Sequence, residues 1–246
     1  MYNFDGKKVT NDIINWIRDW FEENGKGCNA VIGISGGKDS SVVAALCTKA
    51  LGKDRVIGVL MPNGVQHDID MAELLVNHLD IDHVTINIKS AYDAIYQTLD
   101  QKLGGLTKQS QINLPPRLRM TILYAVSQSR NGRVANTSNL SEDYIGFFTK
   151  GGDNIGDFGP ISKLTVAEIK EVGRVLGLPD VLVDKVPIDG LWEETDEDIF
   201  GFTYAALDHY IRTGECPDQE VKNKIDQMHN KNLFKLKEMP TFDYQP

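Results

Sequence analysis

Residues 33–41, "GISGGKDSS", decide how the rest of the sequence is interpreted. The three residues before the stretch, Ala30-Val31-Ile32, are apolar, as in a buried strand, and apolar residues recur at helical spacing over 38–51. Glycines let a backbone approach a ligand closely, and the free N–H groups at the start of a helix favour an anion. The serine hydroxyls add hydrogen-bond donors. The stretch therefore predicts a phosphate-binding loop after a buried strand.

Asp39 lies inside this loop, where its carboxylate would repel a phosphate unless a cation joined the two groups. Magnesium binds carboxylate and phosphate oxygens together in this way. The loop thus predicts a nucleotide that binds with its metal.

Strand and helix patterns alternate on both sides of this loop. Alternation of this kind requires crossover connections, and helices on both faces of a mostly parallel sheet are the usual result. We expect an α/β fold with a central parallel sheet flanked by helices, in a single domain over residues 1–246. The expected strands are 30–35, 55–61, 83–88 and 133–137, and the expected helices are 9–21, 38–51, 68–79, 115–128 and 165–178.

The types of residue present predict three further features of the chain. Pro115 and Pro116 are expected in the first turn of their helix, where proline is tolerated. Residues 149–160 are rich in glycine and poor in apolar residues, which predicts a surface loop with a functional role. The basic and aromatic residues 230–244 are expected to form a tail.

The charge and cysteine content narrow the possible partners and location. With 26 basic and 35 acidic residues the net charge is −9, and no basic run is present, so we expect no nucleic-acid partner. Cys28, Cys47 and Cys216 are widely spaced, as free thiols of a reducing compartment would be. No apolar stretch is long enough to predict a membrane span. We expect a cytoplasmic protein.

Three known loop motifs can be compared with the opening stretch. A Walker A loop is excluded because Asp39 follows Lys38, and a dinucleotide G-x-G-x-x-G is excluded because Ser35 stands at the second glycine position. Gly33 to Gly37 match G-x-S-x-G, the nucleophile elbow of α/β-hydrolases. A hydrolase using Ser35 would need His209 or His229 as its base and stays open as an alternative.

"SGGKDS" (35–40) resembles the pyrophosphate loop of the ATP pyrophosphatases, which cleave ATP between its α and β phosphates. Further segments resemble the ammonia-dependent NAD synthetase family, in order and along nearly the whole chain. These are "MPNGVQHD" (61–68), "NLPPRLRMTILY" (113–124), "NTSNLSE" (136–142), "FFTKGGDNIGDFGPI" (147–161) and "TDEDIFGFTYAALD" (195–208).

The resemblance implies an adenine nucleotide hydrolase-like, Rossmann-like fold and a homodimer. It also implies a ligase of NAD biosynthesis, in which deamido-NAD, ATP and ammonia give NAD, AMP and pyrophosphate through an adenylated intermediate. A different ATP pyrophosphatase, such as one acting on tRNA, is the other alternative, and it would need a basic surface. A glutamine-dependent enzyme carries an additional amidase domain, and about 30 residues before the loop are too few for one. We therefore expect free ammonia as the nitrogen source.

The resemblance also assigns residues to the ATP and metal sites. Asp39 and Glu142 match two magnesium ligands, and both are hard oxygen donors, as this ion requires. The positions that match ATP contacts are Gly33, Ile34, Ser35, Gly36, Gly37, Lys38, Asp39, Ser40 and Thr137.

The second substrate has its own matching positions. Arg117, Lys150 and Asp157 match contacts to deamido-NAD, and the planar guanidinium of arginine suits a dinucleotide. Asp153 matches a position near the reacting carboxyl group. Because the amide-forming step needs neutral ammonia, a proton-accepting, catalytic role is expected for Asp153.

The chain departs from the family pattern at two places. Val166 stands where many members have a lysine that contacts ATP phosphates, and Lys163, which would share a helix face with it, is the expected replacement. Ile188 stands where a hydroxyl residue is usual, so ATP contacts there are not expected. Lys235 and Lys237, in the tail, could close over the site.

Overall fold

Four parallel strands form the central sheet in the order β3-β2-β1-β4. They are β1 (Asn29–Gly33), β2 (Val56–Leu60), β3 (Asp82–Thr85) and β4 (Gly132–Val134). This computed structural model describes residues 2–66, 68–185 and 195–245. The parallel sheet expected from the sequence is confirmed. The chain runs from β1 outward to β3 and then returns to the other side of β1, so the sheet has a topological switch point between β1 and β4.

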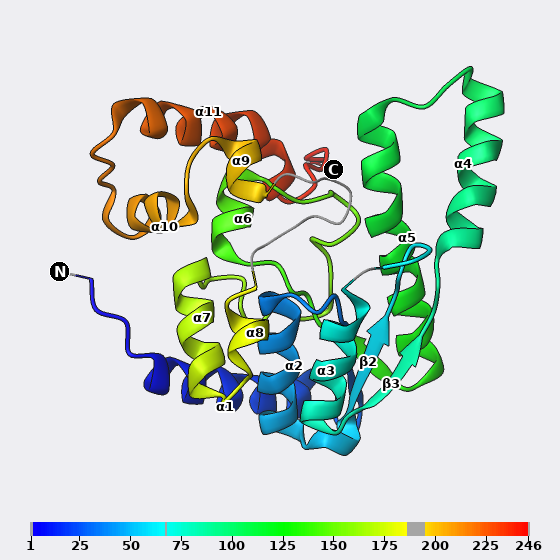
Figure 1. Cartoon of the computed structure of the whole chain (residues 1–246), viewed down its shortest axis with the longest axis vertical. Coiled ribbons are helices and arrows are strands. Elements are labelled where there is room, and N and C mark those ends of the chain that lie inside the picture. The colour runs from blue at the N-terminus through cyan, green and yellow to red at the C-terminus, as the bar shows by residue number, and fades with distance from the viewer. Residues whose placement is uncertain (1, 67, 186–194, 246) are drawn as a thin grey trace.

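Helices cover both faces of this sheet (Figure 1). One face packs on a cluster that includes Ile32, Leu46 and Leu75, and the other on a cluster that includes Val31, Val59 and Leu123. Since β2 is buried along its whole length, it reads as an unbroken apolar run. The first face holds α1 (Gly6–Asn24), α2 (Lys38–Leu51), α3 (Ile69–Leu79), α7 (Val166–Val175) and α8 (Asp180–Val183), and the second holds α5 (Lys108–Ser129).

Two further groups of helices lie beyond the carboxyl ends of the strands (Figure 1). The α4 helix (Lys89–Leu103) packs beside the projecting part of α5. The other group has an apolar cluster of its own, with Ile145, Phe200, Leu207 and Ile225. It consists of α6 (Leu140–Ile145), α9 (Asp196–Phe200), α10 (Tyr204–Thr213) and α11 (Gln219–Leu236). A short 3₁₀ helix outside this group, η1 (Lys53–Arg55), connects α2 to β2.

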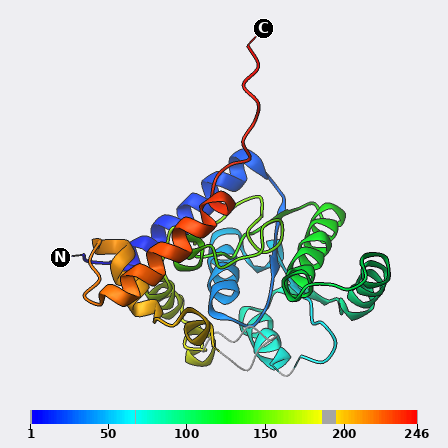
Figure 2. The same ribbon diagram turned by 90° about the horizontal axis from the view of Figure 1, so that it is seen from above.

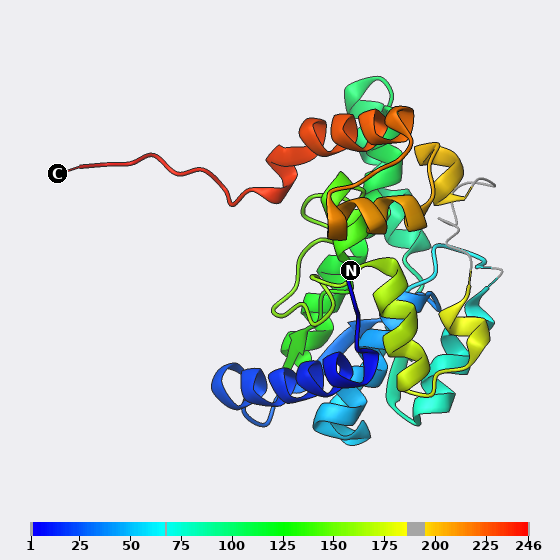
Figure 3. The same ribbon diagram turned by 90° about the vertical axis from the view of Figure 1, so that its left-hand side faces the viewer.

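Figure 2 shows these two groups on opposite sides of the molecule when it is viewed from above. Residues 237–245 leave the end of α11 and extend away from the body (Figure 3), and all of them are exposed. The described tail does not close over the loop at 33–41. Lys237 is exposed at the start of this tail and Lys235 belongs to α11, so a closing role for these two lysines stays a prediction.

Three expectations about elements were wrong. The α5 helix begins at Lys108, so Pro115 and Pro116 lie inside it, because Thr107 accepts a hydrogen bond from Ser110 N and caps the helix eight residues before Pro115. Residues 230–236 belong to α11. The 149–160 segment lacks helix but is not wholly at the surface, since Phe158 is 5% exposed and stacks on Trp20.

All three cysteines are free in this structure, and both Cys28 and Cys47 are buried. Within the described ranges, no helix is long and apolar enough to cross a membrane.

Candidate functional site

The loop after β1 lies at the switch point of the sheet, beside the segment that follows β4. In open parallel sheets this crevice at the carboxyl ends of the strands is the usual ligand site. The α2 helix begins at Lys38, as the sequence predicts, whereas β1 ends at Gly33, two residues before the predicted end of that strand. The predicted phosphate loop therefore occupies the place where such folds bind ligands.

Gly36 gives the loop its sharp turn. Its φ is +77°, and a Cβ at this position would lie 2.8 Å from the backbone nitrogen of Ala72 in α3. Only glycine accepts both conditions, because other residues are strained at this φ and a backbone atom cannot move aside cheaply.

Hydroxyl groups line the start of α2. The Oγ of Ser35 lies 3.1 Å from the Oγ of Ser40 and accepts a hydrogen bond of 3.2 Å from Gly37 N. Ser41 Oγ donates to Gly37 O at 2.7 Å. Gly37 is the N-cap of α2 and offers no side-chain cap to the first-turn N–H groups. The arrangement can bind an anion through backbone N–H groups and the positive end of the helix dipole.

Asn139 links the two carboxylate residues expected to bind metal. Its side chain is fully buried and donates from Nδ2 to Asp39 Oδ1 at 3.2 Å. Its Oδ1 accepts a hydrogen bond of 3.0 Å from Glu142 N, which caps α6. Burial and the neighbouring Asp39 charge raise the pKa of Glu142 to about 8. The structure thus brings Asp39, in the first turn of α2, near Glu142, in the first turn of α6.

A lysine and a second buried pair complete this cluster. Lys38 is 4% exposed, and its Nζ lies 3.0 Å from Asp39 Oδ2. The Tyr204 hydroxyl donates to Asp196 Oδ2 at 3.0 Å. Burial and the nearby Glu142 carboxylate raise the pKa of Tyr204, so the phenol keeps its proton. Both residues come from the "TDEDIFGFTYAALD" segment.

The donor set here suits magnesium. Two carboxylates, from the first turns of α2 and α6, interact electrostatically beside the phosphate loop, and Mg²⁺ is commonly held by one or two carboxylates plus substrate phosphates. Among residues 2–66, 68–185 and 195–245, no group of three or more His, Cys, Asp or Glu side chains could hold a metal without further ligands. A metal bound by Asp39 and Glu142 would need oxygens from the nucleotide.

The glycine-rich segment is anchored to the loop that follows β4. Asn136 Nδ2 donates to the carbonyl of Asp153 at 3.0 Å, and Ser138 Oγ donates to the same oxygen at 3.2 Å. The carboxylate of Asp153 accepts a hydrogen bond of 2.7 Å from Thr149 N. Asp153 is exposed on this rigid segment, and its catalytic role stays a prediction.

Arg117 and Lys150, both predicted to contact deamido-NAD, lie together. The guanidinium of Arg117 donates from Nε and Nη2 to the Lys150 carbonyl at 3.3 and 3.2 Å. Asp157, the third predicted contact, has a structural role as well, because its Oδ2 accepts a hydrogen bond of 2.7 Å from Val134 N at the end of β4. All three side chains are exposed, and their substrate contacts stay predictions.

Lys163 does not share a helix face with Val166. The α7 helix begins at Val166, and Lys163 lies in the turn before it, so the geometric basis of that expectation was wrong. Val166 packs in the apolar cluster with Phe200 and Tyr204, an environment that suits valine better than lysine. Lys163 is exposed and acts electrostatically on Asp143, next to Glu142. Its contact with ATP stays a prediction.

Thr137 lies partly buried in the loop between β4 and α6, between Asn136 and Ser138, and its ATP contact also stays a prediction. Ile188 lies outside the described residues.

The hydrolase alternative is not supported by the surroundings of Ser35. Its hydroxyl is engaged by Ser40 and Gly37 N. Of the two candidate bases, His229 stacks on Tyr144 and contacts the Tyr144 carbonyl at 2.7 Å, and His209 lies on α10.

Several site residues were not singled out from the sequence. Asn139 lies between two predicted residues in "NTSNLSE", and an asparagine before a helix is a recognisable N-cap signal. Lys38 was predicted as an ATP contact, but no sequence motif indicates that its side chain lies in one cluster with Asp196 and Tyr204. Asn63, in "MPNGVQHD", has a buried Oδ1 that lacks a hydrogen-bond partner in the described part of the chain.

Comparison with known proteins gives consistent matches along the chain. The family model for NAD synthase matches residues 9–244. An NH(3)-dependent NAD(+) synthetase of Thermococcus sibiricus is 39% identical over 86% of this chain and 82% of that protein. The solved structure of an NMN synthetase from Francisella tularensis has a TM-score of 0.89 and 33% identity, covering 98% of this chain and 100% of that chain. An NH3-dependent NAD synthetase from Campylobacter jejuni has a TM-score of 0.81 and 29% identity, with the same coverage.

Proposed function

The chain belongs to the NAD synthase family and is a carbon–nitrogen ligase, and we propose that it amidates deamido-NAD with ammonia and ATP. One observation carries this proposal. The buried side chain of Asn139 hydrogen-bonds Asp39 from the phosphate loop and Glu142 N from α6, at the switch point of the sheet. Two carboxylates beside an uncapped helix N-terminus are what a magnesium triphosphate requires.

The first step activates the carboxylate. An oxygen of the nicotinate carboxylate attacks the α-phosphorus of ATP, the bond to the bridging oxygen breaks, and pyrophosphate leaves. The N–H groups at the start of α2 and the hydroxyls of Ser35 and Ser40 stabilise the charge that develops on pyrophosphate. Magnesium held by Asp39 and Glu142 would supply further positive charge there.

The second step forms the amide. Ammonia attacks the carbonyl carbon of the acyl adenylate, AMP leaves, and the nitrogen loses one proton. Asp153 accepts that proton, and the hydrogen bond from Thr149 N holds its carboxylate in place. Arg117 and Lys150, joined through the Lys150 carbonyl, bind the dinucleotide.

The Asp153 role predicts a selective loss of turnover. Asp153→Asn retains an oxygen that can accept from Thr149 N but cannot take a proton, so we expect kcat to fall roughly 100-fold with the KM for ATP little changed. Steady-state kinetics at saturating ammonium would measure both constants. Full turnover by this variant would exclude the role.

The overall assignment is tested in one reaction with magnesium-ATP, deamido-NAD and ammonium at mildly alkaline pH. We expect NAD and pyrophosphate in equal amounts, and neither product when glutamine replaces ammonium. Pyrophosphate without NAD would indicate another acceptor for the AMP group, and the absence of both products would contradict the proposal.

A second candidate substrate is nicotinate mononucleotide, which would give NMN. It is supported by the fit to the Francisella tularensis NMN synthetase, which spans 98% of this chain at a TM-score of 0.89. Both substrates carry the same nicotinate carboxylate, so the chemistry above is unchanged. Measuring kcat/KM for the two substrates in parallel decides between them, and a preference of tenfold or more for the mononucleotide would favour the second candidate.

We further propose that residues 1–246 act as one domain in a cytoplasmic homodimer. The α4 helix carries an exposed apolar row of Ile95, Leu99 and Leu103, four residues apart, which supports a protein contact. The three free cysteines support a reducing compartment. Sedimentation at micromolar concentration should show a dimer, and a monomer alone would contradict it.

A further inference from the structure

Lys38 carries a buried charge whose purpose the phosphate loop alone does not explain. Backbone N–H groups are enough to bind phosphate at a helix N-terminus. Yet the side chain of Lys38 does not extend toward solvent: the residue is 4% exposed, and its ammonium lies 3.0 Å from Asp39 Oδ2. Its Nζ also lies 5.7 Å from the centre of the Tyr204 ring. A buried ammonium requires such partners, because its desolvation is costly.

The surroundings of Lys38 are strongly acidic. The carboxylates of Asp39, Glu142 and Asp196 all act electrostatically on this lysine. Asp196 is itself 6% exposed and is held by the Tyr204 hydroxyl at 3.0 Å. The ammonium is therefore the positive charge of a compact cluster of carboxylates.

Each oxygen of Asp39 accepts a hydrogen bond in this arrangement. Oδ1 accepts from Asn139 Nδ2 at 3.2 Å and Oδ2 from Lys38 Nζ at 3.0 Å. Each oxygen keeps a further lone pair, but a divalent cation approaching Asp39 would be repelled by the adjacent ammonium.

We propose that the Lys38 ammonium is a built-in counter-ion of the Asp39–Glu142 pair, so that the free protein binds magnesium weakly and the metal enters together with the triphosphate. This inference rests on the metal site of the proposed function. When a triphosphate is bound, its negative charges offset the repulsion and its oxygens complete the ligands of the metal. The enzyme thereby selects the metal–nucleotide complex over the metal alone.

A simpler role for Lys38 would be a direct contact with phosphate. In that case, removing the charge would weaken nucleotide binding and leave metal binding to the free protein unchanged. For the nucleotide-free protein, the counter-ion role therefore predicts tighter metal binding when the charge is removed, whereas the phosphate-contact role predicts no change.

The test is a titration with Mn²⁺, followed through the electron paramagnetic resonance signal of the free ion. Wild type, Lys38→Met, Lys38→Arg and Lys49→Met are compared with and without α,β-methylene-ATP, which cannot be cleaved between its α and β phosphates. Lys49 lies exposed in the last turn of the same helix, so its variant is a matched control for the loss of one charge. Circular dichroism checks that each variant is folded.

Without nucleotide, Lys38→Met should bind Mn²⁺ at least ~10-fold more tightly than wild type. Lys38→Arg and Lys49→Met should stay within about twofold of wild type, since the first keeps the charge in the cluster and the second changes a distant charge. Adding Asp39→Asn to Lys38→Met should abolish the gain.

An unchanged Mn²⁺ affinity in Lys38→Met, with wild type binding Mn²⁺ normally beside the nucleotide analogue, would overturn this inference alone. If wild type bound no Mn²⁺ even with the analogue, the proposed metal site and this inference would both be wrong. Equal tightening in Lys49→Met would also overturn the inference, because the effect would then be one of net charge.

Discussion

At the scale of single residues, Gly36 and Gly37 lie side by side in the phosphate loop but face different constraints. Gly36 has a φ of +77° and has the Ala72 backbone nitrogen 2.8 Å from the position of a Cβ. Gly37 has a φ of −87°, and a Cβ there would meet only Ser35 Oγ, at 3.3 Å. The sequence shows two equivalent glycines, whereas the backbone distinguishes them.

This difference predicts unequal effects of alanine. Gly36→Ala should lower kcat/KM for ATP by roughly 100-fold or more, because the loop must shift away from α3 and its N–H groups lose their alignment. Gly37→Ala should lower it by less than about tenfold, since a small movement of a hydroxyl accommodates the methyl group. Steady-state kinetics with varied ATP measure both. Equal losses would show that the turn at Gly36 has no special role.

At the scale of elements, α11 is attached to the end of α6 by three side chains on one face. His229 Nδ1 lies 2.7 Å from Tyr144 O, Asn232 Nδ2 donates to Ile145 O at 2.9 Å, and Lys235 Nζ donates to Gly146 O at 2.8 Å. These carbonyls end the helix that begins beside Glu142, and Lys235 also donates to Phe148 O at 3.2 Å. The contact thus fixes the start of the glycine-rich segment.

Lys235→Met should therefore act on the nicotinate substrate more than on ATP. We expect its KM for deamido-NAD to rise about tenfold, since the segment carrying Lys150 and Asp153 loses two hydrogen bonds to an ammonium. The KM for ATP should stay within about twofold. Lys231→Met, which removes an exposed lysine one turn earlier on α11, is the control. Equal rises in the KM for deamido-NAD and the KM for ATP would indicate that the variant disturbs the whole site and that Lys235 does not specifically position the glycine-rich segment.

Other elements show where sequence patterns failed. The α2 helix has its predicted bounds, whereas α7 begins one residue after its predicted start, where Thr165 and Glu168 form a capping box, and ends three residues before its predicted end. The prolines of α5 suggested a helix start, yet the helix continues through them from Thr107, and α4 was not predicted at all. The α4 helix buries no residue, but Ile95, Leu99 and Leu103 recur at helical spacing along it, so a helical pattern was present in the sequence and was missed.

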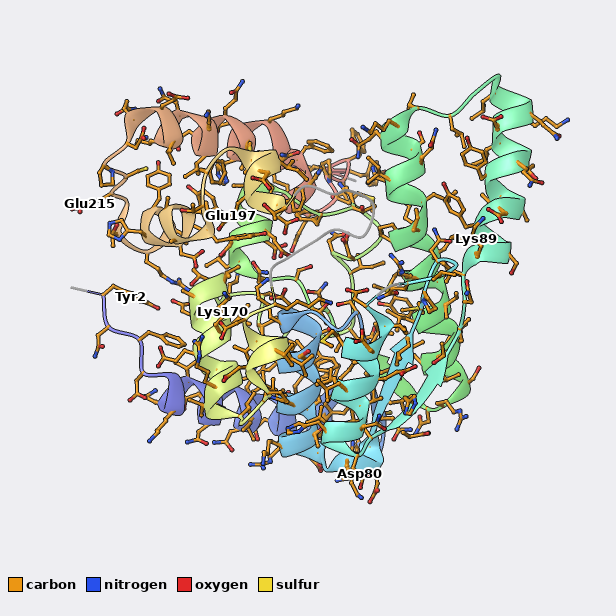
Figure 4. All side chains as sticks on the ribbon, in the orientation of Figure 1. Tyr2, Asp80, Lys89, Lys170, Glu197 and Glu215 are labelled. Atoms are coloured by element: carbon orange, nitrogen blue, oxygen red, sulfur yellow. The ribbon has the colours of Figure 1, made fainter. Side chains whose placement is uncertain are left out.

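At the scale of the whole molecule, one ion pair joins three distant segments. The carboxylate of Glu168 on α7 accepts two hydrogen bonds from Arg212 of α10, one of 2.7 Å from Nε and one of 2.5 Å from Nη2. Tyr2, on the N-terminal segment beside α7 (Figure 4), donates its hydroxyl to the same carboxylate. Burial raises the pKa of Glu168, but the hydrogen bonds from Arg212, Tyr2 and Thr165 N together lower it by more. The pKa of Glu168 therefore lies below its ordinary value of 4.5.

Glu168→Gln should destabilise the protein by about 2 kcal/mol at pH 7, because the partly buried guanidinium of Arg212 loses its charged partner. A depressed pKa adds stability above pH 4.5 that is lost as pH falls through the lower folded value, so the difference between variant and wild type should shrink below pH 4.5. Urea unfolding at several pH values measures this. Glu220→Gln, which breaks an exposed pair with Lys224, should have no measurable effect. A pH-independent difference would contradict the ionic explanation.

The sequence by itself determined the parallel α/β fold, the phosphate loop and the family. These depend on local apolar periodicity and on a short motif, Ser35 to Ser40, whose residues act while adjacent in the chain. Only the tertiary structure decided that Asn139 hydrogen-bonds Asp39 from 100 residues away, and that Lys38 lies among Asp39, Glu142 and Asp196. The physical reason is that burial and electrostatic contact depend on distances in space, which the order of strands in the sheet sets and local sequence does not encode.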